Sequence, residues 1–253
     1  MTRANVKAQG TAPRQEYRFL LDRRNARTAS EVVLQHCRVA DEDYFTPWNI
    51  TVYLDTADLA IYNQAEQGGA LSLRLREYHA DRPVDVLTSS TVWVEFKEIS
   101  KSSRKDRMCL AAEDIVALLT ARQLTPNVLR RLPAQAVEWI DAGVRPVLVT
   151  RCRRRAYQAI GDPLRVTIDQ ELTYLSAKWA DDKDLPGRIA VGPMIAKEHA
   201  VLMELKSSEA LPDWASDLVA SLQEQTDDRP SKFVVGMRHL LRAPDTQALR
   251  AAS

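Results

Sequence analysis

The stretch Leu71-Ser-Leu-Arg-Leu-Arg-Glu-Tyr78 alternates apolar and polar residues, and Thr91-Val-Trp-Val-Glu-Phe-Lys-Glu98 repeats the alternation a few residues later. Side chains of a β-strand point alternately to the two faces of its sheet. The two arginines of the first stretch therefore share one face, and Glu95 and Lys97 share one face of the second. The opposite face of each stretch is apolar. This pattern predicts two strands with a charged face, joined by a polar connection that contains proline.

Pairs of charges that share one strand face occur in three more segments, because their spacing is two or four residues. The additional pairs are Glu16 with Arg18, Arg165 with Asp169, and Glu204 with Lys206. In one interpretation, a sheet packs its apolar side on helices and presents ion pairs to water, where each contributes only about 0–1 kcal/mol. In the other, the sheet curls into a barrel whose lumen is lined by these charges, with helices outside. Repetition of the pattern in five strands favours the barrel.

A lumen of this kind needs an anionic guest, because unpaired like charges held together are costly. Arginine suits phosphate, since its planar guanidinium donates two parallel hydrogen bonds to phosphate oxygens. Carboxylates on the same wall suit Mg²⁺ or Mn²⁺, which bridge carboxylate and phosphate oxygens. The histidines and cysteines are scattered along the chain, which argues against zinc. The charged face therefore predicts a phosphate site that contains a hard divalent metal.

The remaining segments predict an antiparallel α+β fold in one domain. Strands are expected at residues 15–21, 50–55, 147–158, 164–172 and 200–207. Helices are expected from Thr28 (from its capping-box spacing), from Leu59, at 111–122 and 127–142, and from Asp213, with a long loop at 176–198 and a final segment of unassigned structure at 231–241. The domain should span residues 14–242, between flexible tails at 1–13 and 243–253.

Composition narrows the class of protein. The chain has 35 Lys and Arg against 34 Asp and Glu, so it lacks the basic excess of a nucleic-acid-binding protein. Its three cysteines lack a C-x-x-C pairing, and no run is long and apolar enough to be a membrane span or a signal peptide. The sequence predicts a cytoplasmic protein with reduced thiols and no membrane segment of its own, which leaves room for a membrane-bound partner.

Nine short motifs, in order, resemble the vacuolar transporter chaperone (VTC) domain, a polyphosphate polymerase domain of the triphosphate tunnel metalloenzyme (CYTH-like) superfamily. They are Glu16-Tyr-Arg18-Phe, Val52-Tyr-Leu-Asp-Thr-Ala-Asp-Leu59, Leu73-Arg-Leu-Arg-Glu-Tyr78, Val94-Glu-Phe-Lys97, Arg154-Arg-Ala-Tyr157, Leu164-Arg-Val-Thr-Ile-Asp169, Met203-Glu-Leu-Lys206, Leu211-Pro-Asp-Trp214 and Ser231-Lys-Phe233. The resemblance implies an antiparallel eight-stranded β-barrel, the triphosphate tunnel, with helices packed outside. Arg18 stands where the family usually has lysine.

The resemblance also implies roles for individual residues. The expected catalytic residues are Arg74, Arg76, Lys97, Arg154 and Lys232. Substrate is expected to contact these five together with Arg18, Lys105, Arg107, Arg165 and Lys206. Glu204 is expected to hold Mn²⁺ or Mg²⁺, with Glu95 assisting.

The implied activity is transfer of the γ-phosphate of ATP to pyrophosphate or polyphosphate, with release of ADP. The same tunnel supports hydrolysis in relatives, so an inorganic triphosphatase, polyphosphatase or nucleoside triphosphatase is an alternative. A second alternative is a non-catalytic polyphosphate-binding protein. A carboxylate at Glu204 disfavours that reading, because a pure anion binder gains nothing from it.

Overall fold

The computed structural model describes residues 15–40, 46–68, 72–89, 91–98, 104–110, 114–115, 130, 132–180 and 188–243. Its strands are β1 (Gln15–Leu21), β2 (Cys37–Val39), β3 (Trp48–Asp55), β4 (Ser72–His79), β5 (Val92–Glu98), β6 (Arg104–Leu110), β7 (Arg145–Ala159), β8 (Leu164–Ala180), β9 (Arg188–Lys197) and β10 (Val201–Ser207). The helices are α1 (Arg23–His36), α3 (Ala60–Glu66), α6 (Ala134–Asp141), α7 (Asp213–Ser221), the 3₁₀ turn η1 (Gln223–Gln225) and α8 (Lys232–Arg242). None of these helices is both long enough and apolar enough to span a bilayer.

All the strands belong to one antiparallel sheet. Its main path runs β1-β10-β8-β7-β3-β4-β5-β6, while β2 pairs with β7 and β9 with β8. The prediction of a mostly antiparallel α+β fold is confirmed. The prediction of a closed barrel is not: within the described residues β1 and β6 end the path, and no pairing joins them.

The free edge of β1 has a different neighbour, which gives the physical reason why closure fails there. Phe19 forms an antiparallel bridge with Thr226, and the amide of Asp227 donates to the carbonyl of Arg18 at 2.8 Å. Backbone groups that a closing strand would need are therefore used by the segment that leads into α8. The result is a curled sheet with open ends.

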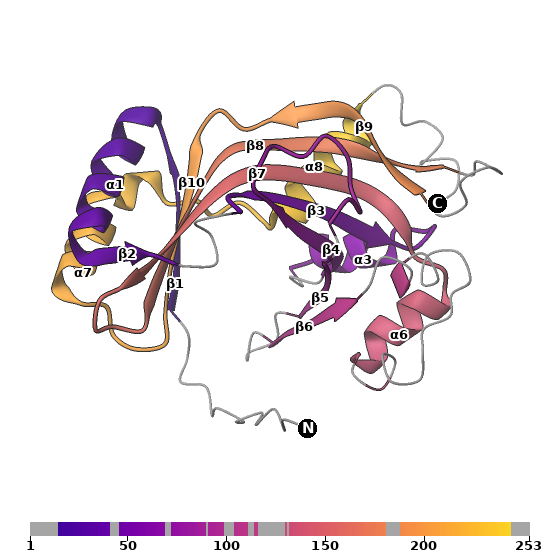
Figure 1. Ribbon diagram of the computed structural model, residues 1–253, viewed down its shortest axis with the longest axis horizontal. Helices are drawn as coiled ribbons and strands as arrows, with labels where there is room; N and C mark the ends of the chain where they lie inside the picture. The colour runs from indigo at the N-terminus through magenta and orange to yellow at the C-terminus, as the bar shows by residue number, and fades with distance from the viewer. Residues whose placement is uncertain are drawn as a thin grey trace.

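The curl comes from the two longest strands. β7 and β8 arch across the molecule and carry the other strands with them (Figure 1). Their pairing shifts register between Arg151 and Arg153, opposite Glu171, which has φ 55°. A bulge of this kind bends a strand and increases its twist, so the strands on either side of it face the same concavity.

Apolar side chains form two clusters against the sheet. In the first, α1 and α7 cover β1, β10 and β8 at one end of the arch, as Figure 1 also shows. In the second, the apolar face of β3, β4 and β5 packs against α6, with Ile140 and Leu73 completely buried. The strand faces that alternation marked as apolar are indeed the ones under helices.

Helix α8 lies on the opposite, charged side of the sheet. Phe233 stacks on Tyr53 with ring centroids 5.0 Å apart, and Tyr53 is in register with Arg74 on β4. A Cβ built on Gly236 would lie within 2.7 Å of Tyr174 Cδ1. Only glycine allows the helix to approach the sheet this closely. The helix therefore occupies one end of the concavity and presents its first turn to the charged strands.

The expected secondary structure is wrong in several places. Helix α1 begins at Arg23, since the Asp22 side chain accepts the Asn25 amide at 2.8 Å, whereas the Thr28 hydroxyl donates to the Arg24 carbonyl within the helix. The expected loop at 176–198 contains the end of β8 and all of β9. The helix expected at 127–142 starts at Ala134, after its N-cap Pro133. No strand was expected at β2 or β6.

Some expectations fall outside the described residues. The tails at 1–13 and 243–253 do so, apart from Ala243, and the helix expected at 111–122 does so except for residues 114–115.

Candidate functional site

The charged side of the sheet encloses a cavity of about 390 Å³. It is lined by Glu16, Arg18, Tyr53, Ser72, Arg74, Arg76, Lys97, Arg154, Glu204, Lys206, Pro230, Ser231, Lys232 and Phe233. These residues come from β1, β3, β4, β5, β7, β10, α8 and the residues just before α8. Curling of the sheet thus gathers seven cationic and two anionic side chains around one space.

Glu95 pairs with two arginines of the cavity, Arg74 and Arg76, and holds them in place. Arg74 contacts Glu95 Oε2 through Nε at 2.9 Å and Nη2 at 2.8 Å, and Arg76 Nη1 lies 3.5 Å from the same oxygen. Arg107 Nε lies 3.3 Å from Oε1. The Glu95 side chain is completely buried and does not line the cavity. Burial lowers the pKa of Arg76, but Glu95 more than offsets this and raises it above its usual value.

A second buried carboxylate, Asp169, holds two more cations. Arg154 donates to both its oxygens, with Nε–Oδ1 and Nη2–Oδ2 each 2.6 Å, and the Lys232 ammonium contacts Oδ2. Burial raises the pKa of Asp169, but Arg154 and Lys232 together lower it well below its usual range. The sequence placed Asp169 on the charged face without giving it a role. Asp169 lies opposite Arg154 across β7 and β8, a pairing that spacing along the sequence does not reveal.

Glu204 is the carboxylate that faces the cavity. Lys206 Nζ lies 3.1 Å from Glu204 Oε2 and also 3.1 Å from Glu16 Oε1, while Arg18 Nε lies 3.9 Å from Glu204 Oε1. Burial raises the pKa of Glu204, but the surrounding cations, led by Lys206 and Lys232, lower it from 4.5 to about 2. The group is therefore ionised at neutral pH, as a metal ligand must be.

Lys97 has no carboxylate within ion-pair distance in the described part of the chain. Burial, reinforced by Arg74 and Lys206, lowers its pKa from 10.5 to about 8. Lys97 is therefore the cation in the cavity whose charge depends most on what binds beside it.

The beginning of α8 is fixed by a chain of ion pairs. Arg18 Nη2 donates to Asp227 Oδ2 at 3.0 Å and Nη1 to the Arg229 carbonyl at 2.9 Å. Arg229 in turn contacts Asp227 and Glu198. This chain holds Ser231, the N-cap of α8, at the cavity. A helix N-terminus carries partial positive charge, so α8 adds to the cationic character of the site.

Three of the expected substrate residues do not line the cavity. Arg165 lies further along the same face, opposite Lys206 on β10 and Gln158 on β7. Arg107 stacks over the ring of Trp93 on β5. The side chain of Lys105 lies outside the described residues; its backbone pairs with Lys97. On the opposite face of β7, Arg151 donates to the Pro83 carbonyl at 2.7 Å, as its alternation with Arg154 predicts.

The carboxylates in the cavity fit a divalent metal whose other ligands are phosphate oxygens of the substrate. No group of three or more His, Cys, Asp or Glu side chains in the described ranges is arranged to hold a metal ion. Mg²⁺, however, is commonly held by one or two carboxylates plus substrate phosphates, and Glu204 and Glu16 both face the space. Glu95 is engaged by three guanidinium groups, so Glu204 is the better candidate ligand.

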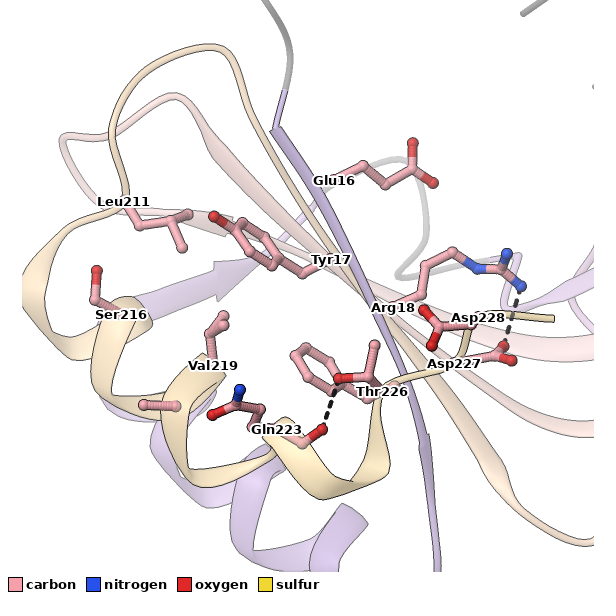
Figure 2. Close-up of a pocket in the computed structure, with 12 residues that line it drawn as sticks. Glu16, Tyr17, Arg18, Leu211, Ser216, Val219, Gln223, Thr226, Asp227 and Asp228 are labelled. Carbon is pink, nitrogen blue, oxygen red and sulfur yellow. Dashed lines mark hydrogen bonds and ion pairs between the residues drawn. The ribbon is translucent and has the colours of Figure 1, made fainter. Parts of the chain in front are cut away.

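A larger cavity, of about 540 Å³, lies on the other side of β1. In Figure 2, Tyr17 points into it towards Leu211 and Val219, while Glu16 and Arg18 extend from the opposite side of the strand. Its cationic side chain is Arg18, which is paired with Asp227. Volume alone would favour this hollow, but the charged groups that can act on phosphate converge in the smaller one.

The fold of this chain resembles that of a protein of known structure. A protein from Bacillus halodurans, whose crystal structure is described as that of a candidate adenylate cyclase, shares the fold with a TM-score of 0.50 at 12% identity, covering 87% of this chain and 97% of that one. The PH1819 protein of Pyrococcus horikoshii OT3 matches with a TM-score of 0.42 at 11% identity, covering 89% and 98%. No curated protein sequence matches significantly. A profile of one family, the VTC domain, matches residues 13–241.

Proposed function

This chain belongs to the VTC domain family, and from that membership we propose that it catalyses metal-dependent phosphoryl transfer from ATP to pyrophosphate or polyphosphate, releasing ADP. The observation that carries the proposal is the convergence of seven cationic side chains and Glu204 on one cavity. A polyphosphate is the substrate class that such a cavity accommodates, because its charges are closely spaced along a chain.

The cationic side chains would bind and orient the phosphates. Arg74 and Arg76 are held by Glu95, and Arg154 and Lys232 are held by Asp169. Their positions are thus fixed before substrate arrives, so little reorganisation is needed when charge develops on the transferring group. Lys97 would gain a full charge on contact with phosphate, which offsets the cost of its burial.

Glu204, assisted by Glu16, would hold Mn²⁺ or Mg²⁺ against the phosphates. When bound, the metal would neutralise charge on the phosphate oxygens. Glu204 is already ionised at neutral pH, so no proton needs to leave when the metal binds.

The reaction itself needs no covalent intermediate with the protein. A terminal oxygen of the acceptor phosphate bonds to the γ-phosphorus while the bond from that phosphorus to the β–γ bridging oxygen breaks, and ADP leaves with that oxygen. Arg74, Arg76 and Arg154 would stabilise the equatorial oxygens during an in-line transfer, and the cavity walls would align donor and acceptor. The walls would also have to keep water from replacing the acceptor.

The test is to incubate the purified protein with ATP and Mn²⁺, seeded with pyrophosphate, and to resolve the products on a gel stained for polyphosphate. The expected result is a ladder of polyphosphate, with one ADP released for each phosphate added to the chain. Free phosphate without a ladder would instead identify a triphosphatase. Tight tripolyphosphate binding without turnover would identify a binding protein.

Two neighbouring residues on β7 provide a matched control. Arg154→Ala should abolish the ladder, because Arg154 lines the cavity. Arg153→Ala removes the same side chain from the opposite face of the strand and should leave the ladder intact. Equal effects of the two substitutions would refute the assignment of the cavity.

A further inference from the structure

Beside the cavity, three side chains form a flat cationic surface on the same face of the sheet. Arg107 of β6 lies over Trp93 of β5, with its guanidinium carbon 3.7 Å from the ring centroid. Its Nη2 donates to the hydroxyl of Tyr78 at 2.9 Å. We call Arg107, Trp93 and Tyr78 the stacking platform.

The position of the platform is set by the sheet. Trp93 is in register with Arg76, and Arg107 is in register with Glu95, so both point to the charged side. Glu95 contacts Arg107 through one carboxylate oxygen and Arg74 and Arg76 through the other. The platform is thus separated from the phosphate-facing arginines by a single carboxylate.

The chemistry of the platform differs from that of the cavity. The Arg107 side chain is 32% exposed, against 14% for Arg74 and 12% for Arg76. A planar guanidinium that lies against an indole ring, donates to the Tyr78 hydroxyl and pairs with Glu95 cannot turn freely. It presents a rigid flat surface, which is what a stacked heterocycle requires.

We propose that the stacking platform binds the base of the nucleoside triphosphate whose phosphates enter the cavity. The proposal rests on the proposed function and adds a nucleoside subsite to it. Arg107 acts there as a stacking surface, not as a phosphate ligand. Every nucleobase offers an aromatic face, so the platform favours nucleotides over inorganic tripolyphosphate without strong preference for one base.

Comparison of two ligands tests the subsite. The affinities of ATP and inorganic tripolyphosphate are measured by calorimetry for the wild type and for Arg107→Lys, which keeps the charge but removes the plane. A stacked base contributes about 5- to 150-fold in affinity. We expect Arg107→Lys to weaken ATP binding by about 5-fold or more, and to change tripolyphosphate binding by less than about 2-fold. Arg153→Lys, the same change on the opposite face of β7, should alter neither.

Every other outcome refutes either the stacking platform or the proposed function. Equal weakening of both ligands would make Arg107 a phosphate ligand and overturn the proposal, as would no change in either. If wild-type protein binds tripolyphosphate as tightly as ATP, the platform is refuted while the proposed function stands. Failure to bind tripolyphosphate at all would refute the proposed function.

A second variant gives an independent readout. ATP, but not tripolyphosphate, should quench tryptophan fluorescence, and Trp93→Leu should remove most of that quench together with the ATP preference. Quenching that survives in Trp93→Leu would place the base elsewhere.

Discussion

Replacement of Asp169 by asparagine should destabilise the protein strongly, although the two side chains have almost the same shape. The Asp169 side chain is 1% exposed and receives two hydrogen bonds from Arg154 and one from Lys232. The amide would offer one acceptor oxygen in place of two and would turn an NH₂ group towards a cation. Two positive charges, on side chains that are 18% and 17% exposed, would lose their buried counter-ion.

The magnitude follows from the burial. Removing one partner of a buried ion pair costs about 3–5 kcal/mol, because the other charge is left uncompensated. With a urea slope of about 2–3 kcal/mol per M, the unfolding midpoint should fall by about 1–2.5 M. Asp217→Asn makes the same chemical change at an exposed position of α7 and should shift the midpoint very little.

Two measurements extend this test. The folded-state pKa of Asp169 lies below its unfolded value of 3.8, so its contribution is complete above that pH and is lost as the pH falls further. Asp169→Asn should therefore flatten the acid limb of the stability curve. Tripolyphosphate should restore part of the lost stability, because its oxygens can pair with Arg154 and Lys232. A loss of less than 1 kcal/mol, with an unchanged acid limb, would refute the view that these cations are desolvated on Asp169.

Three further predictions concern the cavity and the helix beside it. Glu204→Gln should weaken Mn²⁺ binding to the tripolyphosphate complex by at least about 10-fold, since a neutral amide oxygen is a weaker ligand for a divalent cation than a carboxylate; an unchanged affinity in manganese paramagnetic resonance would refute this. Tripolyphosphate affinity should fall as the pH rises through about 8, because Lys97 then loses its proton. In Lys97→Arg, the affinity measured by calorimetry should stay constant between pH 7 and 9. If the affinity of this variant still falls with pH, another group is responsible. Gly236→Ala should cost about 1–3 kcal/mol despite the better helix propensity of alanine, because its methyl group would overlap Leu148 and Tyr174; a thermal melt that shows stabilisation would refute this.

Much of the fold could be read from alternation. The strands at β1, β3, β4, β5, β7, β8 and β10 were all expected near their observed positions, because each has one apolar face under a helix. The strands β2, β6 and β9 escaped prediction, and the last two did so for different reasons. Arg104-Lys-Asp-Arg107 opens β6 with charges on both faces, and β9 carries Gly192 and Pro193, which normally mark loops.

The failure to expect an open sheet has a physical cause that no local pattern contains. Closure depends on which segment takes the edge of β1, and here Thr226 and Asp227 take it from more than 200 residues away. The α1 boundary is a simpler case: Asp22 and Thr28 both begin a sequence compatible with an N-cap, and the earlier one prevails because Ala26 and Ala29 are buried against the sheet.

The sequence predicted which strand face carries the candidate site, but not which side chains pair with one another there. Most of the cations expected to line the site do converge on one cavity, namely Arg74, Arg76, Lys97, Arg154, Lys206 and Lys232. Which carboxylate serves which cation could not be read from spacing, since Glu95 and Glu204 have the same alternation and opposite surroundings. One is enclosed by three guanidinium groups, while the other faces the space where phosphate would lie.

The Glu95 contacts also bear on selectivity among anions. An unrestrained arginine loses about 1.5–2 kcal/mol of rotamer entropy when it is immobilised, and that loss normally falls on the binding step. Arg74 and Arg76 incur most of it during folding, on a shared carboxylate. A polyphosphate, which repeats tetrahedral phosphate groups along a chain, should bind with a small entropic penalty, whereas citrate places its carboxylates at other distances and would have to distort the arrangement. The protein should therefore distinguish anions by the distance between their charges and not by total charge alone.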